Sequence, residues 1–303
     1  WRAAHAYPLH VIYMHLRRMT GTRRDILVVE RLKRLDSIIG KLKRENGMDL
    51  WSMHDLGGCR FIVPTVDEVF AFAEKYKNSR VRHEYKRTYD YINNPKPSGY
   101  RSLHLVYKFH SDTKDTYNQN MLIEIQFRTH LQHVWATALE TMGLFTKQAL
   151  KAGQGEEYVK RFFVLVSSLF ALKEGYPVIP GTLADEKELI SEIEQINNDH
   201  HLVEMLRAIR VALDHEDGKK FDKQGYYVLI LNYNTHRLRI RYFLPSQIDE
   251  ANTLYTQIES NRRATGIDAV LVRAASFGVL KAAYPNYFAD IGEFVDLVEE
   301  YLR

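Results

Sequence analysis

Two carboxylates lie beside predicted strands, where they could hold a divalent metal ion. Asp55 stands just before the apolar strand predicted at 59–63, and Glu124 lies inside the strand predicted at 121–129. A carboxylate on a central strand is unfavourable unless it is paired or ligates a metal. If the two strands are neighbours, Asp55 and Glu124 could share one Mg²⁺. The alternative is that Asp55 caps a helix or turn and that Glu124 pairs with Arg128, and the sequence leaves both open.

Positive charge is concentrated upstream of these carboxylates. Residues 17–44 contain far more Lys and Arg than Asp and Glu, which gives a local positive field suited to phosphates. The cations on or near one predicted helix are Arg31, Lys33, Lys41 and Lys43. Such a group could hold a triphosphate through charge-assisted hydrogen bonds. The alternative is a solvated basic face.

The segment NNPKPSGYRSLH, residues 93–104, predicts a stiff polar loop between two extended segments. Pro95 and Pro97 restrict φ and lower the conformational entropy of the loop, and Gly99 permits backbone shapes that other residues avoid. Tyr100, with cations on either side, has the composition needed to stack on a base and to grip its phosphates. The alternative is a stiff connection that carries an ordinary surface tyrosine.

The elements that must position these groups follow from hydrophobic periodicity. Apolar residues at spacings of three and four, from Ile26 to Leu42, predict a helix over residues 9–46. A threonine cap predicts another helix over 65–78. Extended segments are predicted at 59–63, 80–92, 102–110 and 121–129, and further helices at 130–143, 158–175 and 184–215.

The last third of the chain has a pattern of its own. Residues 219–303 predict a small ββαβα module with a hairpin around Asn234 and Thr235. We therefore expect three segments. The nucleotide site would lie in residues 1–175, a helical linker in 176–218, and a regulatory or oligomerisation module in 219–303.

Composition narrows the class of protein. The chain has 303 residues and a formal charge of +4, which is too mild to indicate a nucleic-acid partner by itself. Its one cysteine, Cys59, excludes a disulfide within the chain and disfavours a cysteine-based zinc site. We find no secretory signal and no apolar run near 18 residues. The chain begins at Trp1 without a methionine, so we expect the natural N-terminus to lie upstream. We also expect a cytoplasmic protein with no membrane partner.

Four motifs, in order along the chain, resemble those of a known family. They are RLKRLDSIIGKLKR, HDLGGCRFIV, DYINNPKPSGYRSLH and IEIQFRT. Together they resemble the synthetase domain of RelA/SpoT-type alarmone synthetases, over about residues 20–140. The resemblance implies an α+β fold, with a nucleotidyltransferase-like mixed β-sheet flanked by helices, a helical extension and the small C-terminal module. It also implies Mg²⁺-dependent transfer of the β,γ-pyrophosphate of ATP to the 3′-hydroxyl of GDP or GTP.

The resemblance assigns roles to residues of this chain. ATP binding would fall to Arg31, Lys33, Ser37 and Lys41. Asp55 and Glu124 would be the catalytic pair and the Mg²⁺ ligands, with Glu124 serving as a metal ligand or as the base on the acceptor hydroxyl. The acceptor side would comprise Lys96, Tyr100, Arg101, His104 and Gln126, with the tyrosine stacked on the guanine.

The chain departs from the family pattern just before the loop. Tyr89 stands where the family often has a lysine, which removes one cation and leaves the acceptor open. One alternative is therefore a toxin that pyrophosphorylates the 3′ end of tRNA, or makes adenosine alarmones. An antitoxin protein or its own module at 219–303 would neutralise it. The module could equally serve homo-oligomerisation. A second alternative is an inactive nucleotide-binding regulator.

Overall fold

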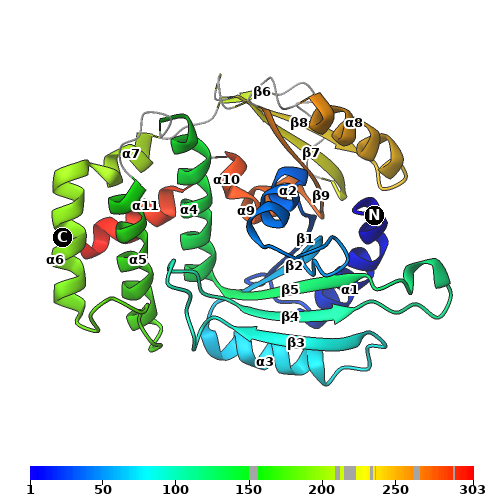
Figure 1. Cartoon of the computed structure of the whole chain (residues 1–303), viewed down its shortest axis with the longest axis horizontal. Coiled ribbons are helices and arrows are strands. Elements are labelled where there is room, and N and C mark those ends of the chain that lie inside the picture. The colour runs from blue at the N-terminus through cyan, green and yellow to red at the C-terminus, as the bar shows by residue number, and fades with distance from the viewer. Residues whose placement is uncertain are drawn as a thin grey trace. The chain divides into compact units, whose positions relative to one another are not determined.

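One mixed β-sheet organises the fold. It is seen in a computed structural model that describes residues 1–149, 156–208, 212–214, 223–232, 235, 237–261, 267–288 and 291–303 (Figure 1). The strands among these residues are β1 (Leu27–Leu32), β2 (Gly57–Val63), β3 (Glu84–Asp90), β4 (Leu103–Lys108), β5 (Leu122–Thr129), β6 (Ala212–Asp214), β7 (Gly225–Asn232), β8 (Arg237–Phe243) and β9 (Ile267–Ala274). Their order in the sheet is β3-β4-β5-β2-β1-β9-β7-β8-β6. Helices accompany this sheet, so the predicted α+β class is confirmed.

The chain forms two compact units, of residues 1–89, 104–127 and 212–283, and of residues 90–103, 128–211 and 284–303. The helices of the first unit are α1 (Ala6–Met19), α2 (Leu35–Arg44), α3 (Val66–Lys77), α8 (Ile248–Asn261) and α9 (Phe277–Ala283). Those of the second are α4 (His130–Ala149), α5 (Glu156–Lys173), α6 (Glu186–His200), α7 (Leu202–Ala208), α10 (Pro285–Phe288) and α11 (Gly292–Tyr301). Two 3-10 turns lie at Ala3–His5 and Asp115–Tyr117.

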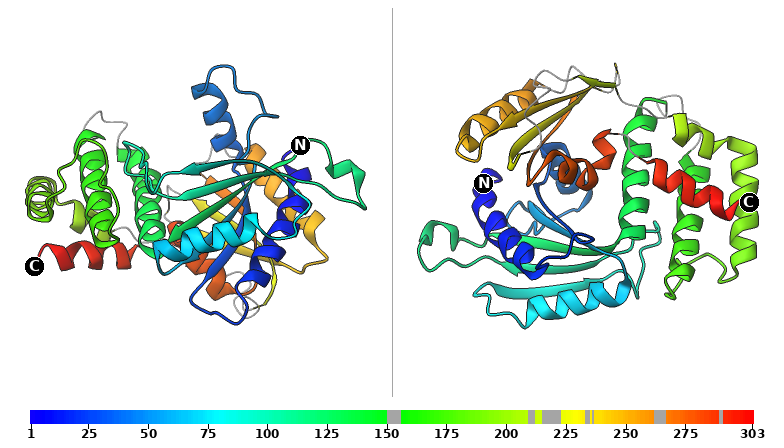
Figure 2. Two further views of the ribbon diagram at one scale, coloured as in Figure 1. Left: turned by 90° about the horizontal axis from the view of Figure 1, so that it is seen from below. Right: turned by 180° about the vertical axis from the view of Figure 1, so that it is seen from behind.

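The C-terminal third is divided between the two units, so the units do not follow the predicted boundaries at residues 175 and 218. Strands β7 and β9 pair along their full length, and β9 continues the sheet by pairing with β1 at Glu30↔Arg273 and Arg31↔Val272. Helix α8 packs on β7 and β9, and α1 packs on β1 and β2 (Figure 2). Helix α11, in contrast, packs against α4 and α7 in the second unit.

The prediction of one continuous helix over residues 9–46 is wrong for the middle third of that range. The structure has α1, a turn with Gly21 at φ +59°, the strand β1, and then α2. Ile26, Val29 and Leu32 match a helical spacing of three, but the intervening Val28 is buried as well. A segment buried on both faces and rich in β-branched residues favours a central strand.

The helix predicted over residues 184–215 is interrupted. It ends as α6 at His200, because His201 adopts a left-handed conformation with φ of 53° and caps the helix. The side chain of Asn197 then accepts a hydrogen bond from the Val203 N–H, at 2.8 Å, which starts α7. Residues Ala212–Asp214 form the short strand β6 instead of helix.

The other predicted elements are confirmed where the structure describes them. Strands β3, β4 and β5 lie within the predicted extended segments, and β2 begins at Gly57, two residues before the segment predicted at 59–63. Thr65 caps α3 by accepting a hydrogen bond from the Glu68 N–H. Strands β7 and β8 form the predicted antiparallel hairpin, although Asn234 at its turn lies outside the described residues. None of the described helices is both long and apolar enough to cross a lipid bilayer.

The second unit has a helical core. Trp135 of α4 donates its indole N–H to the Phe163 carbonyl of α5, at 2.8 Å. Phe163 stacks on Phe294 of α11, with 5.4 Å between the ring centroids. Aromatic rings that pair in this way contribute beyond the area they bury. The last helix of the chain is therefore part of the core of this unit.

Candidate functional site

The register of β1 against β2 brings Lys33 beside Asp55. Leu32 pairs with Gly57, and the Lys33 N–H then donates to the Leu56 carbonyl, at 2.8 Å. Asp55 therefore lies at the end of β2 that faces the end of β1. Gly57 allows close packing here, because a Cβ at this position would meet Ile123 Cδ1 at 2.8 Å.

The Asp55 carboxylate lies between two lysines. Lys33 Nζ donates to its Oδ2 at 2.6 Å, and Lys41 Nζ donates to its Oδ1 at 3.2 Å. All three side chains are less than one fifth exposed. Burial by itself raises the pKa of Asp55, but the two lysines outweigh it, so the pKa lies below its ordinary value. Burial lowers the pKa of Lys33 against the attraction of Asp55. This cluster is a carboxylate held ionised by cations that could also bind phosphates.

Helix α2 carries Ser37 and Lys41 one turn apart, so they share one face of the helix. This face points toward the Asp55 carboxylate, because Lys41 donates a hydrogen bond to it. The neighbouring face holds Ile38, which is buried against Met53 and Leu56. Of the four residues predicted to bind ATP, Lys33 directly follows β1, and Ser37 and Lys41 lie on α2. Lys33 and Lys41 contact the same aspartate.

Arg31 is the fourth of these predicted residues, and it lies on β1 rather than on a helix. Arg60 of β2, which is 6% exposed, lies on the same side of the sheet and was not identified from the sequence as a candidate site residue. Because Arg60 pairs with Val29, and Val29 and Arg31 alternate by two, the two arginines project from the same face. Strand alternation in the motif GGCRFIV, combined with the β1–β2 register, would have found it. Lys43 is exposed on α2.

Glu124 lies on β5 and is 4% exposed. Its Oε1 is 3.0 Å from Nδ1 of His104 and 3.4 Å from Nε2 of His54, and its Oε2 accepts a hydrogen bond from Gln126 at 2.6 Å. Burial by itself raises the pKa of Glu124, but the charge and hydrogen bonds of the two histidines lower it well below its ordinary value. Glu124 is therefore ionised at neutral pH and held in one position. These contacts take the place of the pairing with Arg128 that was the alternative for Glu124.

His54 is a site residue that sequence reasoning missed. Its ring stacks on that of Tyr89 with 5.6 Å between centroids and 25° between planes. Tyr89 is the residue that replaces the family's lysine, and it also accepts a hydrogen bond from Arg87 at 3.0 Å. The only signal in the sequence was the position of His54 directly before Asp55. The tyrosine orients a histidine that contacts Glu124.

The two carboxylates fit a Mg²⁺ ion. Asp55 and Glu124 are close enough that the charge of Glu124 raises the pKa of Asp55. No group of three or more metal-binding side chains occurs in the part of the chain that the structure describes. Mg²⁺ is ordinarily held by one or two carboxylates together with substrate phosphates and water. Two carboxylates beside two lysines that could bind phosphates match that requirement.

The loop over residues 91–102 belongs to the second unit and is anchored at Gly99. Gly99 has φ of +88°, and a Cβ there would lie 2.7 Å from Cζ2 of Trp135. Ser167 of α5 donates its hydroxyl to the Gly99 carbonyl, at 2.6 Å. At the start of the loop, Asp90 accepts hydrogen bonds from the N–H groups of Ile92 and Asn93. The loop is rigid, as the prolines and the glycine predict.

The ring of Tyr100 lies among cations and a second aromatic ring. Arg128 donates to the Tyr100 hydroxyl at 2.6 Å, and its guanidinium carbon is 5.1 Å from the ring centroid. Lys96 Nζ is 5.5 Å from the same centroid and 4.3 Å from that of Tyr91. Tyr91 and Tyr100 pack edge to face with their centroids 6.0 Å apart. This cluster has the aromatic surface and the positive charge that a nucleotide requires.

Arg101 has a contact other than the one that the resemblance implies. Its side chain is 2% exposed and pairs with Glu174 at 2.8 Å. Glu174 also accepts hydrogen bonds from the Thr129 hydroxyl and from Gln132. The guanidinium therefore fixes the end of the loop to the helical core. It holds Tyr100 in place and does not present charge at the surface.

Part of the chain is similar in sequence to known proteins. Residues 30–147 match a family model described as the region found in RelA/SpoT proteins. Over 116 residues the chain is 32% identical to the GTP pyrophosphokinase YwaC of Bacillus subtilis, which covers 35% of this chain. Over 112 residues it is 32% identical to the GTP pyrophosphokinase YjbM of the same organism, which covers 36%. The match spans about half the length of these curated relatives, 52% in each.

A solved structure is also similar. The small alarmone synthetase 1 from Bacillus subtilis, bound to its product pppGpp, is 26% identical, covers 57% of this chain and 89% of its own, and has a TM-score of 0.48. That likeness is too small to assign the fold, which follows from the strand order given above. The similarity to RelA/SpoT proteins is established by the sequence match alone. The matched region includes Arg31, Lys41, Asp55, Tyr100 and Glu124. Residues 30–147 of this chain are therefore similar to the region found in RelA/SpoT proteins.

Proposed function

We propose that this chain is an ATP-dependent pyrophosphokinase that transfers the β,γ-pyrophosphate of ATP to the 3′-hydroxyl of GDP or GTP, in the cytoplasm. The observation that carries the proposal is the pair of ionised carboxylates, Asp55 held between Lys33 and Lys41, and Glu124 held by His54 and His104. The named relatives are GTP pyrophosphokinases, which supports the same reaction class.

The transfer forms one bond and breaks one bond. The 3′-oxygen of the acceptor bonds to the β-phosphorus of ATP, and the bond from that phosphorus to the α,β-bridging oxygen breaks. AMP leaves with the electron pair, and the acceptor gains a pyrophosphate. The hydroxyl proton needs an acceptor, and phosphoryl transfer otherwise depends on positioning and charge neutralisation.

On the ATP side, Lys33 and Lys41 bind the phosphates when these replace Asp55 as their partners. Asp55 and Glu124 would then hold Mg²⁺, which would neutralise charge on the pyrophosphate that is transferred. Arg31 and Ser37 lie on the same two elements as the lysines and bind the rest of the nucleotide. Glu124 Oε1 accepts the proton of the 3′-hydroxyl in the transition state. Its lowered pKa makes it a weak base, so the contribution comes from its position, which three side chains hold.

On the acceptor side, Tyr100 stacks on the base, and Lys96 binds the phosphates of the acceptor. Arg128, which is 3% exposed, holds the tyrosine hydroxyl. The supporting observation is the approach of Lys96 to the Tyr100 ring. Gln126 and His104 both contact Glu124, so we assign them to positioning of the carboxylate as well as to the acceptor. Arg101 acts by fixing the loop.

The tRNA alternative depends on the basic segment around β3. Arg80, Arg82, Lys86 and Arg87 are exposed there. Arg82 pairs with Asp112, and Lys86 with Glu84 at 2.9 Å, so part of this charge is neutralised. The guanine nucleotide is the preferred acceptor because the relatives are GTP pyrophosphokinases.

An acceptor assay tests the proposal. The protein is incubated with Mg²⁺ and γ-³²P-ATP, and GDP, GTP, ATP and deacylated tRNA are offered in parallel. We expect label on GDP or GTP, and none with Asp55→Asn. Label on tRNA alone would replace the proposal with the toxin alternative. ATP binding without label on any acceptor would favour the inactive regulator.

A further inference from the structure

Helix α8, from the C-terminal third of the chain, reaches the N-terminus of α2. The Glu259 carboxylate accepts a hydrogen bond from the Leu35 N–H at 3.2 Å. Leu35 is the first residue of α2, and the preceding residue, Arg34, caps the helix with no side-chain hydrogen bond. The first N–H groups of a helix have no intrahelical partner. A residue 224 positions away therefore supplies the cap that the local sequence lacks.

Glu259 is itself held firmly. Its Oε2 is 2.7 Å from Arg2 Nη1, and its Oε1 accepts a hydrogen bond from the Tyr255 hydroxyl at 2.7 Å. Arg2 also donates to the Tyr255 hydroxyl at 2.9 Å and lies over its ring. The Glu259 side chain is 3% exposed. A buried carboxylate with a charged partner and two further donors occupies one position.

This contact acts on a helix of the candidate site. A negative charge at a helix N-terminus is favourable, because it opposes the positive end of the helix dipole. Helix α2 carries Ser37 and Lys41, and Lys41 contacts Asp55 at 3.2 Å. The position of the first turn sets where these two side chains lie, since Ser37 is two residues from the capped N–H.

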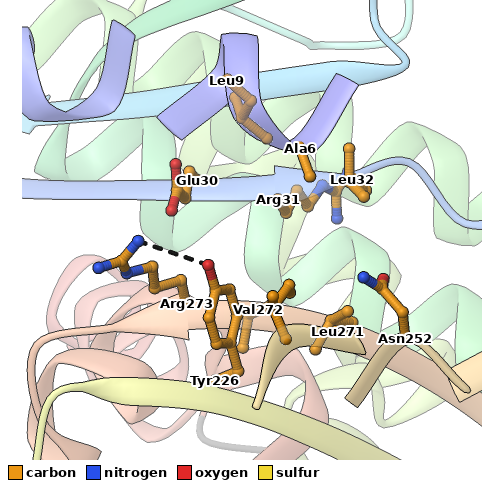
Figure 3. A pocket seen from close by; sticks show the side chains of 11 residues that line it. Ala6, Leu9, Glu30, Arg31, Leu32, Tyr226, Asn252, Leu271, Val272 and Arg273 are labelled. Atoms are coloured by element: carbon orange, nitrogen blue, oxygen red, sulfur yellow. Dashed lines mark hydrogen bonds between the residues drawn. The ribbon is translucent and has the colours of Figure 1, made fainter. Parts of the chain in front are cut away.

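The C-terminal third of the chain also contacts β1, the strand that carries Arg31. Val272 of β9 pairs with Arg31. A small open pocket lies over this junction, between Ala6 of α1 and Asn252 of α8 (Figure 3). At the edge of this pocket, Arg273 donates a hydrogen bond to the Tyr226 hydroxyl at 3.4 Å (Figure 3). Residues 225–274 thus contact both elements that carry the candidate ATP-binding residues.

We propose that Glu259 is a positioning residue for ATP, which acts by capping α2 and so holding Ser37 and Lys41 toward the phosphates. The inference rests on the proposed function in assigning ATP to α2. It makes the C-terminal third a structural part of the ATP site.

Three variants test it. Glu259→Ala removes the cap. Leu35→Pro removes the N–H donor together with the leucine side chain, which is 39% exposed. Proline is accommodated at the first position of a helix, and Arg34 already has extended backbone angles of −63° and 144°. Glu250→Ala is the matched control, since it removes a carboxylate from the exposed first turn of the same helix.

Binding of α,β-methylene ATP with Mg²⁺ is measured by calorimetry, and KM for ATP and for the acceptor by the transfer assay. We expect Glu259→Ala to raise Kd and KM for the adenine nucleotide about five- to tenfold, with the acceptor KM within about twofold. Leu35→Pro should give a smaller rise, and the double variant should add little to Glu259→Ala. Wild-type adenine-nucleotide affinity in a folded Glu259→Ala protein would overturn the inference. If Glu259→Ala does not fold, wild-type affinity in Leu35→Pro would overturn it.

Amide hydrogen exchange separates this inference from the proposed function. Glu259→Ala should speed exchange in the first turn of α2 about tenfold relative to Glu250→Ala, whether or not the protein transfers pyrophosphate. Wild-type protein that transfers nothing would refute the proposed function, while faster exchange and weaker analogue binding would still support the positioning role. Unchanged exchange in α2 would refute the positioning role alone.

Discussion

At the scale of single residues, Glu124 combines near-complete burial with contacts to His54, His104 and Gln126. Glu124→Gln keeps the size of the side chain and removes its charge. We expect kcat for pyrophosphate transfer to fall about 10²- to 10⁴-fold, because a general base is lost, while binding of α,β-methylene ATP changes little. Glu74→Gln on the exposed side of α3 serves as the control. Turnover retained in Glu124→Gln would remove this residue from its proposed role.

The lowered pKa of Glu124 also predicts a dependence of stability on pH. The folded protein keeps this carboxyl ionised at a pH where the unfolded chain, with an ordinary value of 4.5, binds a proton. Stability is therefore fully present above that value and is lost as the pH falls below it. Between about pH 5 and about pH 3 the free energy of unfolding should fall less steeply in Glu124→Gln than in the wild type. Urea unfolding at several pH values measures this, and equal slopes would contradict it.

Tyr100 provides a second test at the residue scale. Tyr100→Ala should raise the acceptor KM by an amount that corresponds to about 1–3 kcal/mol of lost base stacking. Tyr100→Phe keeps the ring but loses the hydrogen bond from Arg128, so it should retain most of the acceptor affinity. The KM for ATP should stay constant in both variants. An unchanged acceptor KM in Tyr100→Ala would show that the ring does not bind the acceptor.

At the scale of the element, the loop over residues 91–102 is stiff because two kinds of constraint agree. Pro95 and Pro97 act on the backbone locally, and Gly99 fits against Trp135 in a conformation that other residues adopt only with strain. Local sequence therefore predicts the rigidity, but only packing on the helical core fixes where the loop ends.

Gly99→Ala tests this anchoring. The added methyl group would lie 2.7 Å from the Trp135 ring, and φ of +88° would be strained. We expect a loss of about 1–3 kcal/mol in the free energy of unfolding, measured in urea, and a raised acceptor KM. Gly143→Ala in α4 is the matched control, because nothing lies within 4 Å of its added Cβ and alanine favours helix. Equal stabilities of the two variants would argue against the anchor.

At the scale of the whole molecule, the C-terminal third contributes to both compact units. Truncation after residue 222 would expose the edge of β1, remove Glu259 from α2, and remove Phe294 from the helical core. We expect the truncated chain to be insoluble or to lose cooperative thermal unfolding, while deletion of the exposed Arg303 has no effect. A folded, more active truncated protein would instead support the proposal of a regulatory module at 219–303. Sizing of the intact protein tests the proposal of a homo-oligomer.

The sequence alone determined the elements whose signals are local. Strand β5 alternates apolar and polar residues, Thr65 caps α3, and the prolines stiffen the loop, so these could be predicted from neighbouring residues. The family resemblance added the roles of Asp55, Tyr100 and Glu124. Periodicity failed at β1, because Ile26, Val29 and Leu32 have helical spacing although the strand is buried on both faces.

The tertiary structure decided the contacts between residues far apart in the chain. His54 meets Glu124 across 70 residues, and Glu259 meets Leu35 across 224. Such contacts depend on strand register and on helix packing. The local sequence around either residue does not determine these features by itself. Strand pairing and helix packing also assign the C-terminal third to two units. Strand β9 pairs with β1 in the first unit, and α11 buries its apolar face among the helices of the second.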